Sequence, residues 1–340
     1  MLSGLLTTGI GSLPHRSADE GCPLILDTFD IPFWPQLPQA SFLETMVPQY
    51  AEGLPFLEID SAKERYYIKR KAQDELNTFY EKYTENPSIA ISAEYAVGFY
   101  KMVELLKTRG RYDCLKGHVT GPLTFTLGIR DEDGKYLFFD EELREIALML
   151  LIGKVKWQTD ILKQYADKVI IFIDEPIFTA LGSSAYLGVS TKEAGRLIEE
   201  IITGVRTAGA VAGIHTCGKC DWDVVFDAKP DIVNFDSFDY FDTIAMYHKR
   251  ISEYISKDGI LAWGMVPTTP SVNNEDEHSI IKKFDERLNS LTKNVDRDLL
   301  ISNLMLTPSC GTGALTVHET ERVFRLIKAL RGHIVEKYGR

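Results

Sequence analysis

This 340-residue sequence has no long apolar run, no signal-peptide pattern at residues 1–15 and few positive charges. The most apolar helix-like run, residues 146–153, is far shorter than the roughly 20 residues of a membrane-spanning helix. Residues 1–15 lack the basic start and the long apolar segment of a signal peptide. We therefore expect a cytoplasmic protein that has no membrane partner.

Basic residues are outnumbered by acidic ones, 38 to 49, which gives a formal charge of −11. Because binding to a phosphate backbone needs clustered Lys and Arg, this balance argues against a nucleic-acid partner. The hydrophobic fraction of 44% is typical of a globular protein with a large core. No composition break divides the chain, so we expect one domain over residues 1–340.

Cysteines are few as well: Cys22, Cys114, Cys217, Cys220 and Cys310. Their odd number and wide spacing do not suggest a disulfide framework. In a large cytosolic protein, clustered cysteines are more typical of metal ligands or nucleophiles.

Short apolar runs alternate with amphipathic stretches along most of the chain. We predict strands at 5–12, 54–60, 114–121, 168–175, 210–217, 231–238, 259–266 and 303–310, and helices at 141–166, 190–209, 278–294 and 316–332. This alternation indicates an α/β fold with a parallel sheet, and eight strands predict closure into a (β/α)8 TIM barrel. The region 13–53, rich in Pro and aromatics, is expected to be an N-terminal insertion: a helix plus a long loop near the barrel mouth.

Polar and metal-binding residues fall at the predicted carboxyl ends of strands, where barrel enzymes carry their chemistry. They are Ser12, Asp174, Glu175, His215, Cys217, Asp236 and Cys310. His215 and Cys217 are two residues apart in an extended segment, so their side chains point to the same side. Cys310 stands on a glycine-flanked turn that permits close backbone approach. Two thiolates and one imidazole leave a fourth position open, which is typical of catalytic zinc.

Structural explanations stand beside each of these assignments. A lone buried cysteine is usually a small hydrophobe, and a lone histidine is usually a hydrogen-bonding residue of the core. Cys220 forms a C-x-x-C pair with Cys217, but a second such pair is missing, so we expect a nearby thiol rather than a ligand. Asp236 is the better candidate for an extra oxygen ligand or for a residue that orients one, with capping as its alternative. Asp174 suits a substrate ammonium group, and its alternative role is also capping. We expect Asp174 and Asp236 to be the catalytic residues.

Six segments in order, TTGIGSLPH (7–15), HVTGPLTF (118–125), IFIDEP (171–176), IHTC (214–217), DIVNFD (231–236) and TPSCG (307–311), resemble the catalytic barrel of cobalamin-independent methionine synthase. The resemblance covers nearly the whole chain. It implies that zinc is held by His215, Cys217 and Cys310, with Asp236 in the place of an acidic ligand. It also implies that Ile10, Gly11 and Ser12 contact an amino-acid substrate and that Asp174 binds its ammonium group. Zinc would lower the pKa of a bound thiol from about 8.5 to below neutral.

The sequence also departs from that family. Pro48 or Gln49 stands where the family has an acidic residue, and Glu44 is expected to substitute for it in the substrate pocket. Val266 stands where the family has a histidine that protonates the departing folate, and we expect no counterpart of the family's second, N-terminal barrel. A methylcobalt donor needs no such proton, because cobalt(I) leaves as such. We therefore expect a methylated corrinoid or corrinoid protein as donor, unless His15 supplies the acid.

The expected function is zinc-dependent methyl transfer to a small-molecule thiol, with homocysteine as acceptor and methionine as product. One alternative is another thiol such as coenzyme M, which would call for cationic rather than acidic partners. A second is a decarboxylase of the uroporphyrinogen type, whose superfamily fold is similar; that reaction needs several arginines, and only Arg16 is an obvious candidate. A third is a non-catalytic protein that binds zinc or a methyl carrier.

Overall fold

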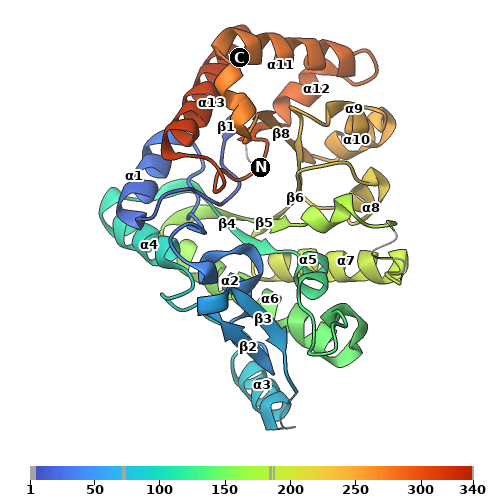
Figure 1. Ribbon diagram of the computed structural model, residues 1–340. Coiled ribbons are helices and arrows are strands. Elements are labelled where there is room, and N and C mark those ends of the chain that lie inside the picture. The colour runs from blue at the N-terminus through green and yellow to red at the C-terminus, as the bar shows by residue number, and fades with distance from the viewer. Residues whose placement is uncertain (1–4, 71–73, 184–185, 187, 339–340) are drawn as a thin grey trace.

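The computed structural model describes residues 5–70, 74–183, 186 and 188–338 (Figure 1). A curled sheet of seven parallel strands runs in the order β1-β9-β8-β7-β6-β5-β4. Its strands are β1 (Leu6–Thr7), β4 (Tyr112–Thr120), β5 (Ala166–Asp174), β6 (Val211–Thr216), β7 (Ile232–Asp236), β8 (Ile260–Val266) and β9 (Leu304–Pro308). This α/β arrangement is consistent with a TIM-like barrel, and it confirms seven of the eight predicted barrel strands.

The segment 31–36 lies in the gap between β1 and β4, inside the region expected to be an insertion. Its Ile31 N–H donates to the Thr7 carbonyl over 3.0 Å on one side. On the other side the Lys116 N–H donates to the Pro32 carbonyl over 2.8 Å. Only isolated parallel bridges form there, because Pro32 and Pro35 have no N–H to donate to a ladder. The described residues thus do not close the sheet with an eighth regular strand.

The predicted barrel strand 54–60 is wrong. Residues 57–60 form β2 (Leu57–Asp60), which pairs antiparallel with β3 (Arg65–Ile68) in a separate hairpin. The sheet order contains neither strand of this hairpin. A short apolar run therefore marked a strand but not the sheet that it joins.

All four predicted helices are confirmed: α6 (Glu141–Leu162), α7 (Thr191–Thr207), α11 (Glu277–Leu291) and α13 (Val317–Tyr338). Asp140 and Ser190 cap α6 and α7 by accepting hydrogen bonds from backbone N–H groups three residues on. The other α-helices are α1 (Ala18–Thr28), α2 (Met46–Ala51), α3 (Asp74–Glu85), α4 (Val97–Arg109), α5 (Pro122–Gly128), α8 (Trp222–Asp227), α9 (Phe241–Ala245), α10 (His248–Ile255) and α12 (Arg297–Ser302). Helices that neighbour one another around the sheet pack together, as α1 does with α4 and α11 with α13 (Figure 1).

Two apolar cores result from this arrangement. The larger one fills the space between the sheet and its helices. The smaller one lies on the inner face of the sheet and consists of Ile10, Ile31, Cys114, Ile170, Phe172, Ile232, Ala262 and Met305. Because side chains alternate along a strand, the residues that follow Phe172 and Ile232 on the inner face are Asp174 and Asn234. The inner core therefore forms a floor beneath the polar strand ends.

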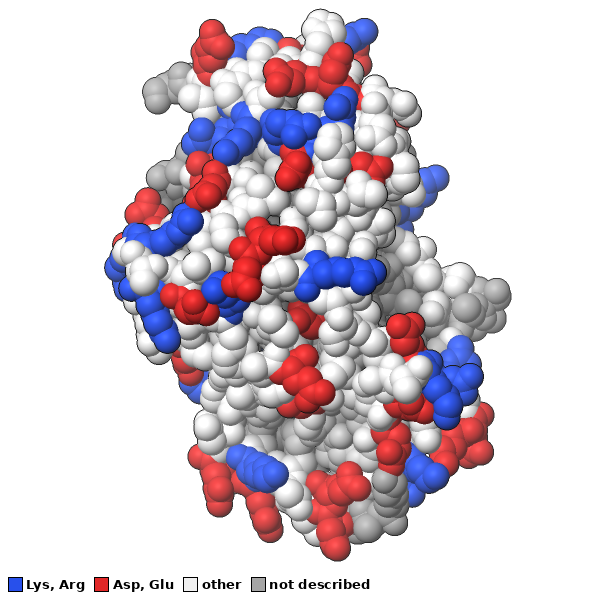
Figure 2. Space-filling model, turned by 60° about the vertical axis from the view of Figure 1, so that its left-hand side comes forward, with Lys and Arg blue, Asp and Glu red and all other residues white. Residues whose placement is uncertain are grey.

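The surface fits the composition. Acidic and basic side chains are interspersed on the face drawn in Figure 2, without a broad basic area there. Among the described residues, we find no helix with both the length and the apolar character of a membrane span.

Candidate metal centre

Three predicted ligands meet at the carboxyl ends of two strands. His215 lies at the end of β6, Cys217 follows that strand by one residue, and Cys310 follows β9 by two. One ligand atom from each of the three residues lies within 4.8 Å of the other two. The imidazole is buried and both thiols are half-buried. The structure thus brings together residues that are up to 95 positions apart, as the predicted zinc site requires.

A buried asparagine orients the imidazole. The Asn234 amide nitrogen donates to the Ala262 carbonyl over 2.9 Å and to the Thr307 hydroxyl over 2.7 Å. Its oxygen therefore faces His215 and accepts a hydrogen bond from Nδ1. That bond fixes the tautomer whose lone pair is on Nε2, and this atom is buried without a partner among the described residues. An orphaned nitrogen held in this way fits a metal ligand.

The charges of the three residues depend on one another. The close approach of Cys310 and His215 lowers the pKa of the Cys217 thiol, whereas the close approach of Cys217 raises the pKa of the Cys310 thiol. Burial acts to lower the pKa of His215, but the contact with Cys217 raises it overall. The lowered pKa favours the thiolate form of Cys217. Cysteine binds zinc in this deprotonated form, so the cluster suits zinc.

Asp236 and Cys220 lie outside this three-residue cluster among the described residues. Asp236 Oδ1 accepts hydrogen bonds from the N–H groups of Phe238 over 2.8 Å and Asp239 over 2.9 Å, so it caps the turn after β7. Burial raises the pKa of Asp236 to about 6. Burial also raises the pKa of the Cys220 thiol. A ligand or catalytic role for Asp236 remains a prediction.

A buried acid and a buried base lie next to the cluster. Asp174 pairs with His215 across β5 and β6, and its Oδ1 has no hydrogen-bond partner in the part of the chain described. Lys116 is fully buried on β4, donates to the Ile10 carbonyl and lies 4.5 Å from the centre of the Phe172 ring. Burial raises the pKa of Asp174 and lowers that of Lys116, and their attraction opposes both shifts. Our sequence reasoning missed Lys116, although a lysine within an apolar strand is itself a signal.

The first-strand residues connect the two ends of the chain. The Ser12 carbonyl accepts a hydrogen bond from the Thr312 N–H over 2.9 Å, and its hydroxyl accepts one from the Gly313 N–H over 3.2 Å. Ile10 belongs to the inner core, and the Gly11 carbonyl accepts a bond from the Gln36 N–H. Ser12 therefore holds the loop that follows Cys310. Substrate contacts by all three remain predictions.

Glu44, a predicted substrate contact, is buried and bonded to the backbone. One carboxylate oxygen accepts a hydrogen bond from the Leu37 N–H over 2.8 Å, and the other accepts one from the Val97 N–H over 3.0 Å. Burial raises the pKa of Glu44 to about 7. Both oxygens support the backbone, which favours a structural role over the predicted substrate contact.

Two solved structures share this fold, one of a methionine synthase and one of a putative methionine synthase. A B12-independent methionine synthase from Shewanella sp. W3-18-1, in complex with selenomethionine, has a TM-score of 0.60 and 14% identity, with 97% of this chain and 98% of that chain covered. A putative vitamin-B12 independent methionine synthase from Listeria monocytogenes has a TM-score of 0.57 and 14% identity, with 98% and 99% covered. The sequence matches no protein-family model and no curated protein.

Glu175, in the segment 171–176 that resembles the methionine synthase barrel, has a structural role. Glu175 is fully buried and accepts hydrogen bonds from the Leu123 N–H, the Thr124 N–H and the Thr124 hydroxyl over 2.7–2.9 Å. It thereby caps α5, while burial raises its pKa to about 7. A side-chain carbon on Gly121 would stand only 2.1 Å from the Glu175 carboxylate. Gly121 is therefore needed for the close approach of strand and helix.

Gly121→Ala is accordingly expected to destabilise the protein by about 2–4 kcal/mol, because the added carbon displaces a buried carboxylate that accepts three hydrogen bonds. Urea unfolding of the metal-loaded protein measures this effect. Gly195→Ala is the matched control, since nothing lies within 4 Å of a side-chain carbon added there. In the middle of α7 it should leave stability equal or slightly higher. Equal stability of the two variants would contradict the capping role.

The sequence predicts that Val266 replaces an acid that would protonate a departing folate, and that His15 is the other possible source of this proton. Val266 ends β8, is fully buried and accepts a hydrogen bond from the Ser309 N–H over 2.8 Å through its carbonyl. Its side chain has no proton to give. His15 is buried against α1, where burial lowers its pKa, and its Nδ1 has no partner among the described residues.

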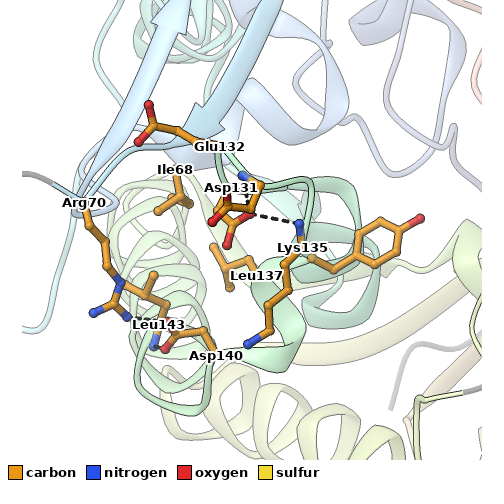
Figure 3. A pocket seen from close by; sticks show the side chains of 10 residues that line it. Ile68, Arg70, Asp131, Glu132, Lys135, Leu137, Asp140 and Leu143 are labelled. Carbon is orange, nitrogen blue, oxygen red and sulfur yellow. Dashed lines mark hydrogen bonds and ion pairs between the residues drawn. The ribbon is translucent and has the colours of Figure 1, made fainter.

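A cavity of about 150 Å³ lies elsewhere, beside β3 and the start of α6 (Figure 3). The Arg70–Asp140 ion pair and the acidic turn at Asp131 form part of its wall. None of its lining residues belongs to the metal cluster. This hollow is therefore not a candidate for the proposed chemistry.

Proposed function

We propose that this protein is a zinc-dependent methyltransferase whose acceptor is the thiol of homocysteine and whose product is methionine. The observation that carries the proposal is the convergence of His215, Cys217 and Cys310 at the strand ends. Three such ligands leave one tetrahedral position for a substrate sulfur. The shared fold with two methionine synthases supports the same reaction class, and the Shewanella protein was solved with an amino acid, selenomethionine.

The residues around the cluster divide the work of binding and orientation. Zinc, when bound, would lower the pKa of the substrate thiol and so supply a nucleophilic thiolate. Asn234 keeps the His215 Nε2 lone pair available, and the Asp174 carboxylate binds the substrate ammonium group. The inner core below Asp174 excludes water from beneath the pocket. The methyl group passes to the substrate sulfur as its bond to the donor breaks.

We also propose a methylated corrinoid, free or protein-bound, as the donor. Val266 supports this because it cannot protonate a leaving folate amine. The direct test of the whole function is to incubate zinc-loaded protein with homocysteine and a panel of methyl donors and to measure methionine. Methionine formation that requires both zinc and homocysteine is expected. Failure of every donor, together with failure to bind zinc, would refute the proposal.

Asp174→Asn is expected to raise the KM for homocysteine by roughly tenfold to a hundredfold, because a charge-assisted bond to the ammonium group is worth roughly 1.5–3 kcal/mol. The KM for 4-mercaptobutyrate, which is homocysteine without its amino group, should stay the same. Asp133→Asn, on an exposed turn, is the matched control. An unchanged KM for homocysteine in Asp174→Asn would rule out this carboxylate as the ammonium partner.

A further inference from the structure

An ammonium group has three N–H donors, and one carboxylate rarely satisfies all of them in a buried pocket. The residues after Met46 and Val47, where the resemblance predicts a second acid, are Pro48 and Gln49. Both oxygens of Glu44 accept backbone hydrogen bonds, which favours a structural role for this residue. Uncharged acceptors near the first strand therefore become relevant.

Two buried glutamines form a relay whose direction is fixed. The Gln49 amide nitrogen donates to the Tyr95 carbonyl over 2.8 Å, so its oxygen is the atom that faces Gln36. That oxygen accepts a hydrogen bond of 2.6 Å from the Gln36 amide nitrogen. The Gln36 oxygen consequently points the other way and lies 3.4 Å from where a side-chain carbon on Gly11 would stand. The relay thus presents an acceptor above Gly11.

His118, on β4, also lies next to Gly11. Its ring is fully buried and stacks on Trp34 at a centroid distance of 4.0 Å, which fixes its plane. Nδ1 lies 3.4 Å from the same point above Gly11. Neither ring nitrogen has a hydrogen-bond partner among the described residues. Burial and the nearby charge of Lys116 lower the pKa of His118, so the imidazole is neutral and one nitrogen can accept a hydrogen bond.

Lys116 interacts with both the first strand and Asp174. It donates to the carbonyl of Ile10, the residue before Gly11, and it is attracted by the charge of Asp174. The carboxylate and the two neutral acceptors therefore border one stretch of the chain. Because Gly11 has no side chain, no Cβ stands against either acceptor at this position.

We propose that Gln36 and His118 complete the acceptor set for the substrate ammonium group, that Gln49 is the positioning residue for Gln36, and that the missing side chain of Gly11 keeps both acceptors uncovered. This inference rests on the proposed function, since it takes the thiol acceptor to be an amino acid. The selectivity for an amino thiol is then set by neutral acceptors together with a single acid, Asp174.

The test is calorimetric binding of homocysteine and of 4-mercaptobutyrate to zinc-loaded protein. Gln36→Leu and His118→Phe should each weaken homocysteine binding by roughly tenfold to a hundredfold, the effect of losing a hydrogen bond to a charged group. Binding of 4-mercaptobutyrate should be unchanged. Gln164→Leu, at an exposed position, is the matched control. Zinc content equal to that of the unmodified protein shows that each variant is folded at the site.

Gly11→Ala provides a second test that leaves both acceptors in place. Gly11 does not have a positive φ, so alanine is compatible with its backbone. The added methyl group would lie 3.4 Å from both the Gln36 oxygen and His118 Nδ1, so it should obstruct a ligand that approaches them and weaken binding of homocysteine selectively. If all three variants keep the preference of the unmodified protein for homocysteine, the inference is wrong and the proposed function stands. If the unmodified protein binds neither thiol, the proposed function fails, and the inference fails with it.

Discussion

Replacing Cys310 by alanine is expected to abolish tight zinc binding and with it all methyl transfer. Cys310 is one of three ligands that meet within 4.8 Å, and the two others cannot form a site with a single open position. The loss should appear as less than one zinc per chain after dialysis against a chelator, measured by elemental analysis. The unmodified protein should keep about one zinc per chain under the same conditions.

Cys220→Ala is the matched control for that experiment, because Cys220 is a half-buried cysteine outside the cluster. Its zinc content and activity should equal those of the unmodified protein. Asp236→Asn extends the comparison to the remaining predicted ligand. Full zinc occupancy in Cys310→Ala, or loss of zinc only in Cys220→Ala, would show that the ligand set is wrong.

Methyl transfer from methylcobalamin or a methylated corrinoid protein is expected to exceed transfer from methyl-folate by about 10²–10⁴-fold, the usual contribution of a general acid. A folate amine leaves poorly unless it is protonated as the methyl group departs. Val266 has only an apolar side chain at the end of β8. The measurement is the initial rate of methionine formation with each donor at saturating homocysteine.

His15→Phe separates two explanations of any residual folate reaction. If His15 supplies the acid from another side, this variant should lose the folate reaction and keep the corrinoid reaction. Fast methionine formation from methyl-folate, together with none from corrinoids, would reverse the proposal and indicate a shortened folate-type enzyme.

The cluster of proposed metal ligands was predictable because the chemistry of its residues is unusual at strand ends. His215, Cys217 and Cys310 combine a two-residue spacing with a glycine-flanked turn, and both features survive without knowledge of the fold. The buried polar residues Asn234 and His118 were not singled out. Their roles depend on which face of a strand points inward, and this depends on the curvature of a sheet assembled from distant segments.

The main error of the predicted fold was the segment that lies between β1 and β4, which we expected to be 54–60. Residues 54–60 have the apolar character of a strand, whereas 31–36 contains two prolines and so lacks a strand signal. The structure uses 31–36 between β1 and β4 because isolated bridges and a few backbone bonds suffice there. Local propensity could not show this, since the partners Thr7 and Lys116 lie far away in sequence.

The bonds between Ser12 and the turn at Thr312 span 300 residues of sequence. During synthesis, the last proposed ligand, Cys310, therefore reaches its place only after nearly the entire chain has been made. His215 and Cys217 leave the ribosome about 95 residues earlier, without the third ligand that tight binding needs. Because contacts of such long range form late, acquisition of the metal should report the final step of folding, when the two ends of the chain meet.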